Sequence, residues 1–299
     1  MNVLVTGATG TIGGHVVRAL RQRGVTPRAF VRDPDKAASV LGTNVELAVG
    51  DFADRASIER AARGIDSVYL ACANVPDQVA YECAVIDAAK EAGVARIVKL
   101  SGPGAVVDSP LTFGRWHGEI EEHLRGSGVP WVLLRPGPFM TNLLAFADTI
   151  QQTGKLFAPA GSAEIAYVDP RDVAAAAAAT LATSGHEGRT YVLTGPAAVT
   201  YQEIAGALSA ATGRAIDYVD VPPDAARQGM LDAGLPSMIA DSIIEVFALF
   251  RAGDMTRTTG TVRALTGREP GTFAQFARDH AALFGAREDA LSAPASSRS

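Results

Sequence analysis

The 299-residue sequence has few of the features that mark proteins of membranes, oxidising compartments or nucleic acid complexes. It contains only two cysteines, Cys72 and Cys83, which are too few for a disulfide framework, so we expect reduced core thiols and no metal site. No apolar run approaches the roughly 18 residues of a membrane span, so we expect no membrane association. Basic residues are interspersed with acids at a net charge of -5, which argues against direct binding to nucleic acid.

We also expect no leader of an exported protein. The first residues of the chain, MNVLVTGATG, run directly into a strand and a glycine loop, without a basic segment, an apolar segment or a cleavage site. We therefore expect a cytoplasmic protein. Hydrophobic residues make up 47% of the chain, which is enough for one large α/β domain or for a core that carries a smaller lobe.

Short β-branched runs alternate with longer helical stretches as far as about residue 195. This alternation is typical of a parallel sheet with helices on both faces. We predict an α/β fold of the Rossmann type, with a doubly wound parallel sheet. The expected strands lie at 3–6, 27–31, 45–49, 67–71, 96–100, 131–134 and 190–193.

A glycine-rich loop joins the first strand to an amphipathic helix. The segment TGATGTIG places Gly7, Gly10 and Gly13 at three-residue intervals. In this context the first glycine allows a tight turn, the second lets the backbone approach a pyrophosphate, and the third allows close helix packing. The start of the helix supplies free N–H groups and a positive potential to an anion. We predict an adenine dinucleotide whose phosphates lie at Thr9, Gly10, Thr11 and Ile12.

The end of the second strand indicates which dinucleotide binds. NAD-preferring Rossmann proteins place an acidic residue about twenty residues after the loop, on the ribose 2′-hydroxyl. This chain has Arg32 there, with Lys36 close enough to add positive charge and Asp33 of the opposite sign. Because a guanidinium pairs with a phosphate through two parallel hydrogen bonds, NADP(H) is favoured over NAD(H). The alternative for Arg32 is a solvated surface side chain.

Beyond residue 195 the strands fade and helices dominate, at 201–212, 225–234, 237–252 and 273–284. Two of them begin at capping boxes, Thr200 with Glu203 and Thr272 with Gln275. We therefore predict a smaller, mainly helical substrate lobe after the nucleotide-binding core. The expected division is a core at 1–195 that includes a cleft loop and helix at 136–165, a lobe at 196–285 and a disordered tail at 286–299.

Several segments together resemble the NmrA-like atypical short-chain dehydrogenases. They are TGATGTIG with Arg32, GDFAD at 50–54, HGEIEEHLRGSGVPWVLLRPGPFMTNLL at 117–144 and YVDPRDVAAAA at 167–177. That family includes NADPH-dependent quinone and triphenylmethane dye reductases as well as cofactor-sensing regulators, so the resemblance implies the cofactor better than the reaction. It places Asp51 and Phe52 at the adenine. The cofactor-binding residues predicted on this basis also include Ala71 and Pro138.

The chain departs from the Ser, Tyr and Lys set of the catalytic short-chain dehydrogenases, in which a YxxxK helix turn lets the tyrosine exchange a proton with a carbonyl. Counting back from EIEEHLRGSG puts Phe113 at the tyrosine position and His117 at the lysine position. His117 is a candidate proton donor because histidine titrates near neutral pH; a contact with the nicotinamide ribose or a solvated helix start are the alternatives. Ser101, at the end of the fifth strand, either lines the pocket or caps the following turn.

The segment after the sixth strand is expected to pass over the nicotinamide. Phe139, Met140 and Asn142 would then face a substrate pocket together with Phe113, and ordinary packing is the alternative; Arg135 is expected to anchor this loop by a salt bridge. We predict an oxidoreductase that uses NADPH to reduce a quinone-like or conjugated carbonyl small molecule, by hydride transfer without a Tyr and Lys pair. The alternatives are an NADP(H)-sensing regulator without turnover and an isomerase or lyase. Homodimer formation is left open.

Overall fold

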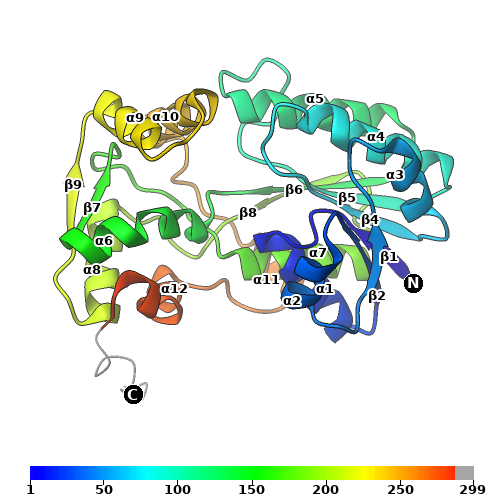
Figure 1. The fold of residues 1–299 in the computed structure, drawn as a ribbon, viewed down its shortest axis with the longest axis horizontal. Coiled ribbons are helices and arrows are strands. Elements are labelled where there is room, and N and C mark those ends of the chain that lie inside the picture. The colour runs from blue at the N-terminus through cyan, green and yellow to red at the C-terminus, as the bar shows by residue number, and fades with distance from the viewer. Residues whose placement is uncertain (287–299) are drawn as a thin grey trace. The chain divides into compact units, whose positions relative to one another are not determined.

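Seven parallel strands form the larger sheet of the computed structural model, which describes residues 1–286. The strands are β1 (Asn2–Val5), β2 (Thr26–Val31), β3 (Glu46–Val49), β4 (Ser67–Leu70), β5 (Arg96–Leu100), β6 (Trp131–Pro136) and β8 (Arg189–Leu193). Their order is β3-β2-β1-β4-β5-β6-β8, with every neighbouring pair parallel. The chain winds outward from β1 in one direction and from β4 in the other (Figure 1). The predicted doubly wound Rossmann-type sheet is confirmed.

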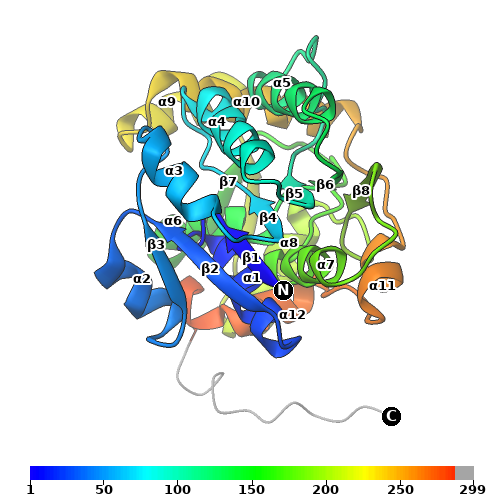
Figure 2. The ribbon, with the colours of Figure 1, turned by 90° about the vertical axis from the view of Figure 1, so that its right-hand side faces the viewer.

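Helices cover both faces of this sheet. They are α1 (Thr11–Gln22), α2 (Pro34–Leu41), α3 (Arg55–Ala62), α4 (Gln78–Glu91), α5 (Thr112–Gly126), α7 (Pro170–Ala182) and α11 (Thr261–Thr266). Helices α1, α2, α7 and α11 pack together on one face, and α3, α4 and α5 pack together on the other (Figure 2). The alanine run of α7 is buried, because small side chains let α1 approach closely.

Aliphatic side chains hold the sheet against α3, α4 and α5. Leu4, Val68 and Ile97 on the strands share one buried cluster with Ile86 on α4 and Ile120 on α5. Burial of each such side chain contributes roughly 1.5–3 kcal/mol relative to exposure. The carboxyl ends of β1, β4 and β5, where parallel sheets place their ligands, therefore stand on a well-packed support.

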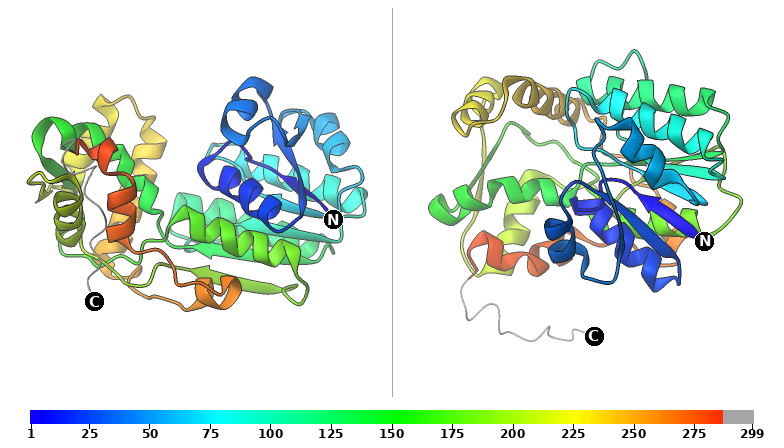
Figure 3. Two further views of the ribbon diagram at one scale, coloured as in Figure 1. Left: turned by 90° about the horizontal axis from the view of Figure 1, so that it is seen from below. Right: turned by 45° about the vertical axis from the view of Figure 1, so that its right-hand side comes forward.

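A second unit is built around a two-stranded parallel sheet, in which β7 (Lys155–Ala158) pairs with β9 (Asp217–Asp220). Its helices gather around these strands (Figure 3) and are η1 (Met140–Phe146), α6 (Ala147–Thr153), α8 (Tyr201–Thr212), α9 (Pro223–Asp232), α10 (Ser237–Ala252), α12 (Phe273–Asp279) and η2 (Ala281–Phe284). Both predicted capping boxes are present, at the starts of α8 and α12. The two strands were not predicted, because each has four residues and pairs with a distant part of the chain.

Each unit is assembled from three separate stretches. Unit 1 comprises Met1–Pro136, Pro170–Leu193 and Thr261–Arg268, and unit 2 comprises Gly137–Asp169, Thr194–Gly260 and the described residues from Glu269 onward. This division differs from the expected boundary at residue 195 and from the expected place of 136–165 in the core. Part of 137–169 packs into the aromatic core of unit 2, and α11 packs on α7 and β8. The predicted tail at 286–299 lies outside the described residues, apart from Ala286. No helix within residues 1–286 is long and apolar enough to cross a membrane.

Candidate functional site

The glycine loop between β1 and α1 leaves no room for side chains at two of its glycines. Gly7 has a φ of +59°, and a Cβ built on it would lie 2.9 Å from the carbonyl oxygen of Ala71, the residue after β4. A Cβ on Gly13 would overlap the backbone of Gly7 and Ala8. The predicted residue Ala71 is therefore in direct contact with the loop. Thr6, which was not singled out from the sequence, fixes this contact, because its hydroxyl bonds the backbone N–H and carbonyl of Ala71 at 2.8 and 2.9 Å.

The start of α1 is open to an anion. Gly10 precedes the helix in an extended conformation, no side chain caps the first turn, and that turn contains no acidic residue. Gly10 and Thr11 are exposed, whereas Thr9 is half-buried and Ile12 is buried in the core. A Cβ on Gly10 would lie 3.1 Å from the Gly7 carbonyl oxygen, which is tight but close to what real side chains tolerate. The uncapped amides and the positive end of the helix dipole suit a pyrophosphate.

Two cations stand at the end of β2. Arg32 and Lys36 are exposed, and neither side chain has a hydrogen bond or ion pair within residues 1–286. Asp33 is drawn away from them, because its carboxylate accepts the backbone N–H groups of Asp35 and Lys36 at 2.9 and 3.0 Å and so caps α2. The carboxylate of Asp33, whose negative charge was expected to oppose that of Arg32, is therefore bound to backbone N–H groups of α2.

An aromatic group follows β3. Phe52 stacks on Tyr81 of α4 at 5.9 Å between ring centroids and meets the edge of Phe30 at 5.4 Å. Asp51 is half-buried, and its Oδ1 accepts the backbone N–H of Ala53 at 2.9 Å. Tyr81 was not singled out from the sequence, since nothing in its local pattern separates it from a packing residue. The roles of Asp51 and Phe52 at an adenine stay predictions.

The residues at this edge of unit 1 fit an adenine dinucleotide. The loop excludes a Cβ at Gly7 and Gly13, the helix behind it offers uncapped amides, and Arg32 offers an unpaired guanidinium. Such a set binds two linked phosphates and one further phosphate on the ribose. Within residues 1–286 no three His, Cys, Asp or Glu side chains gather as metal ligands.

Ser101 is tied to a buried carboxylate. Ser101 is 4% exposed, and its hydroxyl donates to Glu121 Oε1 at 2.6 Å. Arg135 donates to both oxygens of Glu121, at 2.9 and 2.5 Å, and Arg125 donates to Oε2 at 2.7 Å. Burial alone would raise the pKa of Glu121, but the bonds from Arg135 and Ser101 outweigh it and lower that pKa. The Ser101 proton is therefore committed to this network, and its catalytic role stays a prediction.

Arg135 forms a salt bridge, as expected, but it anchors a different loop. It joins Glu121 of α5 and donates to the carbonyl oxygen of Ala105, in the loop after β5, at 2.7 Å. The anchored segment is thus the loop between β5 and α5. Sequence reading could not find Glu121 as the partner, because it appears there only as one of several acids on a helix.

His117 lies half-buried on α5 against a second buried network. Its Nδ1 lies 3.3 Å from Nζ of Lys99, and Lys99 pairs with Glu82 of α4 at 2.5 Å. Burial, then the charges of Lys99 and Arg135, lower the pKa of His117 well below its ordinary value. At neutral pH the ring is therefore uncharged, which corrects the expectation of a histidine that titrates near neutral pH. Lys99 was not singled out, since a lysine in a strand is usually read as solvated.

Phe113 lies one helical turn before His117 on α5, as the spacing predicts. It is half-buried, and its ring contacts Trp116 at 5.5 Å between centroids. A phenyl ring has no proton to transfer. Its predicted place in a substrate pocket is not tested by these contacts.

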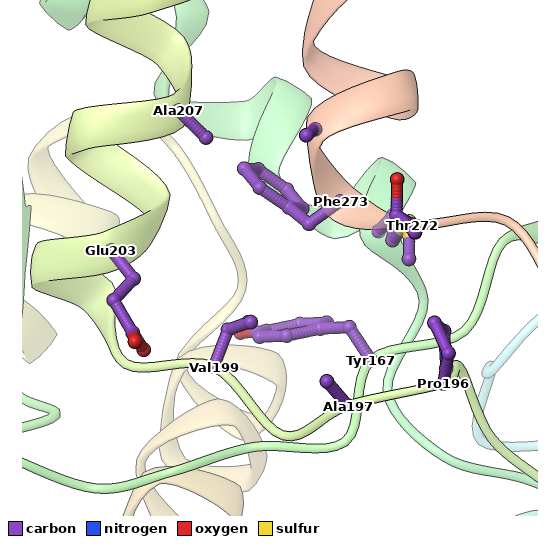
Figure 4. Close-up of a pocket in the computed structure, with 10 residues that line it drawn as sticks. Tyr167, Pro196, Ala197, Val199, Glu203, Ala207, Thr272 and Phe273 are labelled. Carbon is purple, nitrogen blue, oxygen red and sulfur yellow. The ribbon is translucent and has the colours of Figure 1, made fainter. Parts of the chain in front are cut away.

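The four remaining predicted residues belong to unit 2. The carbonyl oxygen of Pro138 accepts the N–H of Val168 at 2.9 Å, and Phe139 forms a parallel bridge with Val168. Met140 is buried, whereas Asn142 is exposed. Met140 also lines a cavity of about 270 Å³ (Figure 4), whose lining residues are Met140, Tyr167, Pro196, Ala197, Val199, Glu203, Ala207, Thr272, Phe273 and Ala274.

The comparisons with known proteins agree with this geometry. A family model described as NmrA-like family matches residues 1–262. An NAD(P)H azoreductase of Xenophilus azovorans is 42% identical over 284 residues, which cover 95% of this chain and 99% of that protein. An NADPH-dependent quinone oxidoreductase of Escherichia coli, complexed with NADPH, has a TM-score of 0.84 at 30% identity and covers 93% of this chain and 99% of its own. A triphenylmethane reductase of Citrobacter sp., complexed with NADP(H), has a TM-score of 0.83 at 25% identity with the same coverage, 93% and 99%.

Proposed function

The chain belongs to the NmrA-like family, and we propose that it is an NADPH-dependent reductase of quinone-like or conjugated carbonyl small molecules. The observation that carries the proposal is the open phosphate cradle at Gly7, Gly10 and Gly13 beside the unpaired Arg32. The relatives support it, because all three are named as reductases or oxidoreductases and two are complexes with NADPH or NADP(H).

The preference for NADP(H) follows from charge. A 2′-phosphate at the end of β2 would meet the exposed side chains of Arg32 and Lys36, while the carboxylate of Asp33 is held by backbone N–H groups. Hydrogen bonds between a guanidinium and a phosphate contribute about 1.5–3 kcal/mol. NAD(H) has no group to make them, so its binding would be weaker by about that amount.

The class of substrate follows from the missing phenol. When bound, NADPH supplies a hydride to the acceptor. A simple ketone concentrates the charge on one oxygen and needs a strong acid beside it. Phe113 offers no proton where the tyrosine of related dehydrogenases stands, and the neutral ring of His117 is only a weak acid. A quinone or extended conjugated acceptor spreads that charge over its own π-system, so orientation contributes most of the rate. An azo dye is an acceptor of the same electronic kind and belongs in the substrate panel.

The experiment is NADPH oxidation by the purified protein against quinones, enones, an azo dye and simple ketones, together with a calorimetric measurement of NADPH binding. We expect turnover of the conjugated acceptors and little with simple ketones. Tight binding without turnover of any acceptor would instead select the sensing regulator, an alternative that the names of the relatives do not favour. Turnover limited to simple ketones would contradict the assignment of the substrate class.

The proposal extends to the setting of the protein. Its partner is a small-molecule substrate, and we propose no direct contact with nucleic acid, a cytoplasmic location and a homodimer as the oligomeric state to test. Sedimentation of the purified protein with and without NADPH measures that state, and fractionation of the source cells measures the location.

A further inference from the structure

Lys99 is a charged side chain without exposed surface, and each proton of its ammonium group has an acceptor. Nζ lies 2.5 Å from Glu82 Oε2, 2.8 Å from the carbonyl oxygen of Leu100 and 3.3 Å from His117 Nδ1. Glu82 is equally buried, and its Oε1 accepts from the amide of Gln78 at 3.0 Å. Three protons thus match three acceptors, and both carboxylate oxygens are paired.

An ammonium group only donates hydrogen bonds, so it fixes the proton on the histidine that faces it. Nδ1 of His117 must present a lone pair to Lys99. In a doubly protonated ring the N–H at Nδ1 would point at an N–H of the Lys99 ammonium group, and the two would repel each other. The ring is therefore neutral and carries its proton on Nε2, and the buried Lys99 with Glu82 behind it determines this tautomer.

Nε2 is the free end of the ring. It has no hydrogen-bond partner within residues 1–286. Gly102, two residues after β5, makes room for it, since a Cβ there would lie 2.8 Å from Cδ2 and 3.2 Å from Nε2. The unpaired N–H thus lies near the carboxyl end of β5, at the edge where parallel sheets bind their ligands.

We propose that Lys99 is a positioning residue for His117, which holds the ring with its proton on Nε2 for the substrate and replaces that proton through Nδ1 after it is donated. Glu82 holds the ammonium group of Lys99 in place. The tautomer stands on the contacts alone, whereas the replacement of the proton rests on the proposed reductase function.

In the proposed transfer of a proton to the reduced acceptor, each bond that breaks is matched by one that forms. Hydride transfer leaves a negative charge on an oxygen or nitrogen of the conjugated acceptor. The Nε2–H bond of His117 breaks as its proton bonds that atom, and an Nζ–H bond of Lys99 breaks as its proton bonds Nδ1. The ring ends as the other neutral tautomer, and Lys99 ends as a neutral amine. Water then protonates Nε2 and leaves as hydroxide into solvent, while Nδ1 returns its proton to Lys99. The carboxylate of Glu82, which lacks a cationic partner until then, favours this return.

Few other groups near this network titrate close to neutral pH. The charge of Arg135 on β6 acts on His117, and Arg135 is paired with Glu121 of α5. Burial, then the charge of Glu82, raises the pKa of Tyr69 on β4 far above its usual value and raises the pKa of Cys72 to about 11. Burial, with Asp87 and Glu82, raises the pKa of Cys83 to about 11. Apart from burial, the pKa of His117 therefore depends on the charges of Lys99 and Arg135.

Nitrogen-15 spectra of the histidine rings in the full-length protein test the tautomer without any substrate. Two-bond proton–nitrogen correlations show which ring nitrogen carries the proton, and the signals of His117 are assigned by their loss in His117→Gln. We expect a neutral ring with its proton on Nε2, which stays neutral as the pH falls through the ordinary histidine value of about 6.5. A proton on Nδ1, or protonation near 6.5 in the parent protein, would overturn the proposal even if no variant folds.

The double variant Lys99→Met with Glu82→Gln removes both buried charges together, because removal of one alone leaves the other unpaired. In this variant we expect His117 to lose its fixed tautomer and to gain a proton at a higher pH than in the parent. The control is Lys90→Met, the same substitution at an exposed lysine of α4, which should change neither result. Spectra of the double variant identical to those of the parent would show that Lys99 does not set the tautomer.

The same variants test the supply of the proton in the reductase assay. With an acceptor that the parent reduces, we expect kcat of the double variant to fall about 10- to 100-fold while the Kd for NADPH is unchanged, and the solvent deuterium isotope effect to shrink. An unchanged kcat would refute the supply of protons by Lys99. If the parent reduces no acceptor, the proposed function fails, whereas the spectra still decide the tautomer.

Discussion

The burial of a neutral His117 predicts how the stability of unit 1 depends on pH. The pKa of this histidine is lowered in the folded protein by burial and by the charges of Lys99 and Arg135, whereas the unfolded chain has a value of about 6.5. Below that pH the unfolded state binds a proton that the folded state does not bind. The free energy of unfolding therefore falls as the pH falls, until the folded-state pKa is reached.

The size of this effect follows from the unfolded value alone, provided that the folded pKa stays below the range measured. Proton binding by the unfolded chain lowers the free energy of unfolding by less than about 0.1 kcal/mol at pH 7.5 and by about 1.4 kcal/mol at pH 5.5. The variant His117→Gln removes the titrating group, while the glutamine oxygen can still accept from Lys99. Between these two pH values we expect the variant to lose about 1.3 kcal/mol less stability than the parent.

Urea unfolding followed by tryptophan fluorescence measures this difference where it arises. The chain has two tryptophans, and both Trp116 on α5 and Trp131 on β6 belong to unit 1. Every other group that titrates in this range is common to the two proteins, so only His117 contributes to the difference. Equal losses in the parent and the variant would mean that His117 takes up a proton while folded, and the account of its neutral ring would be wrong.

Three further substitutions test the cofactor site and its support. Gly10→Val should abolish NADPH binding in calorimetry with circular dichroism unchanged, because the side chain would stand before the pyrophosphate; unchanged affinity would remove the glycine loop from the site. Arg32→Glu should weaken NADPH at least about 10-fold with little effect on NADH, while Arg23→Glu, at the exposed far end of α1, should change neither; a parent that prefers NADH would refute the specificity. Glu121→Gln should lower the free energy of unfolding at pH 7 by about 1–3 kcal/mol in urea titrations, since Arg135 and Ser101 lose a charged acceptor, and a neutral result would show that the network is dispensable.

Local sequence patterns predicted the larger sheet well, for a physical reason. Each of its strands is a short run rich in β-branched and aliphatic residues with a helix or a turn after it, so the signal lies within a few residues of each strand. Strands β7 and β9 carry no such signal, because KLFA and DYVD become strands only by pairing with each other across many intervening residues. The division into units could not be predicted for the same reason, since it depends on contacts between stretches that are far apart in the sequence.

The candidate site shows the same limit on a smaller scale. The glycine spacing and Arg32 were visible because the motif is local. The neutral state of His117 was not, because it depends on Lys99 eighteen residues earlier and on Glu82 one helix away. A lysine inside the apolar run IVKL was the available signal, since a charge at that place in a central strand has to be paired when it is buried.

The chain returns to unit 1 at α11, so unit 1 can be completed only late in synthesis on the ribosome. Helix α11 packs on α7 and against β8, one of the two edge strands of the large sheet, yet it comes after most of unit 2 in the chain. A nascent chain that ends near residue 195 would hold the whole glycine loop but would leave this edge uncovered, and uncovered edges invite pairing with other chains. Folding of the nucleotide-binding unit therefore finishes only when residue 268 has emerged, which leaves a window in which early release or truncation yields an aggregation-prone half rather than a working smaller protein.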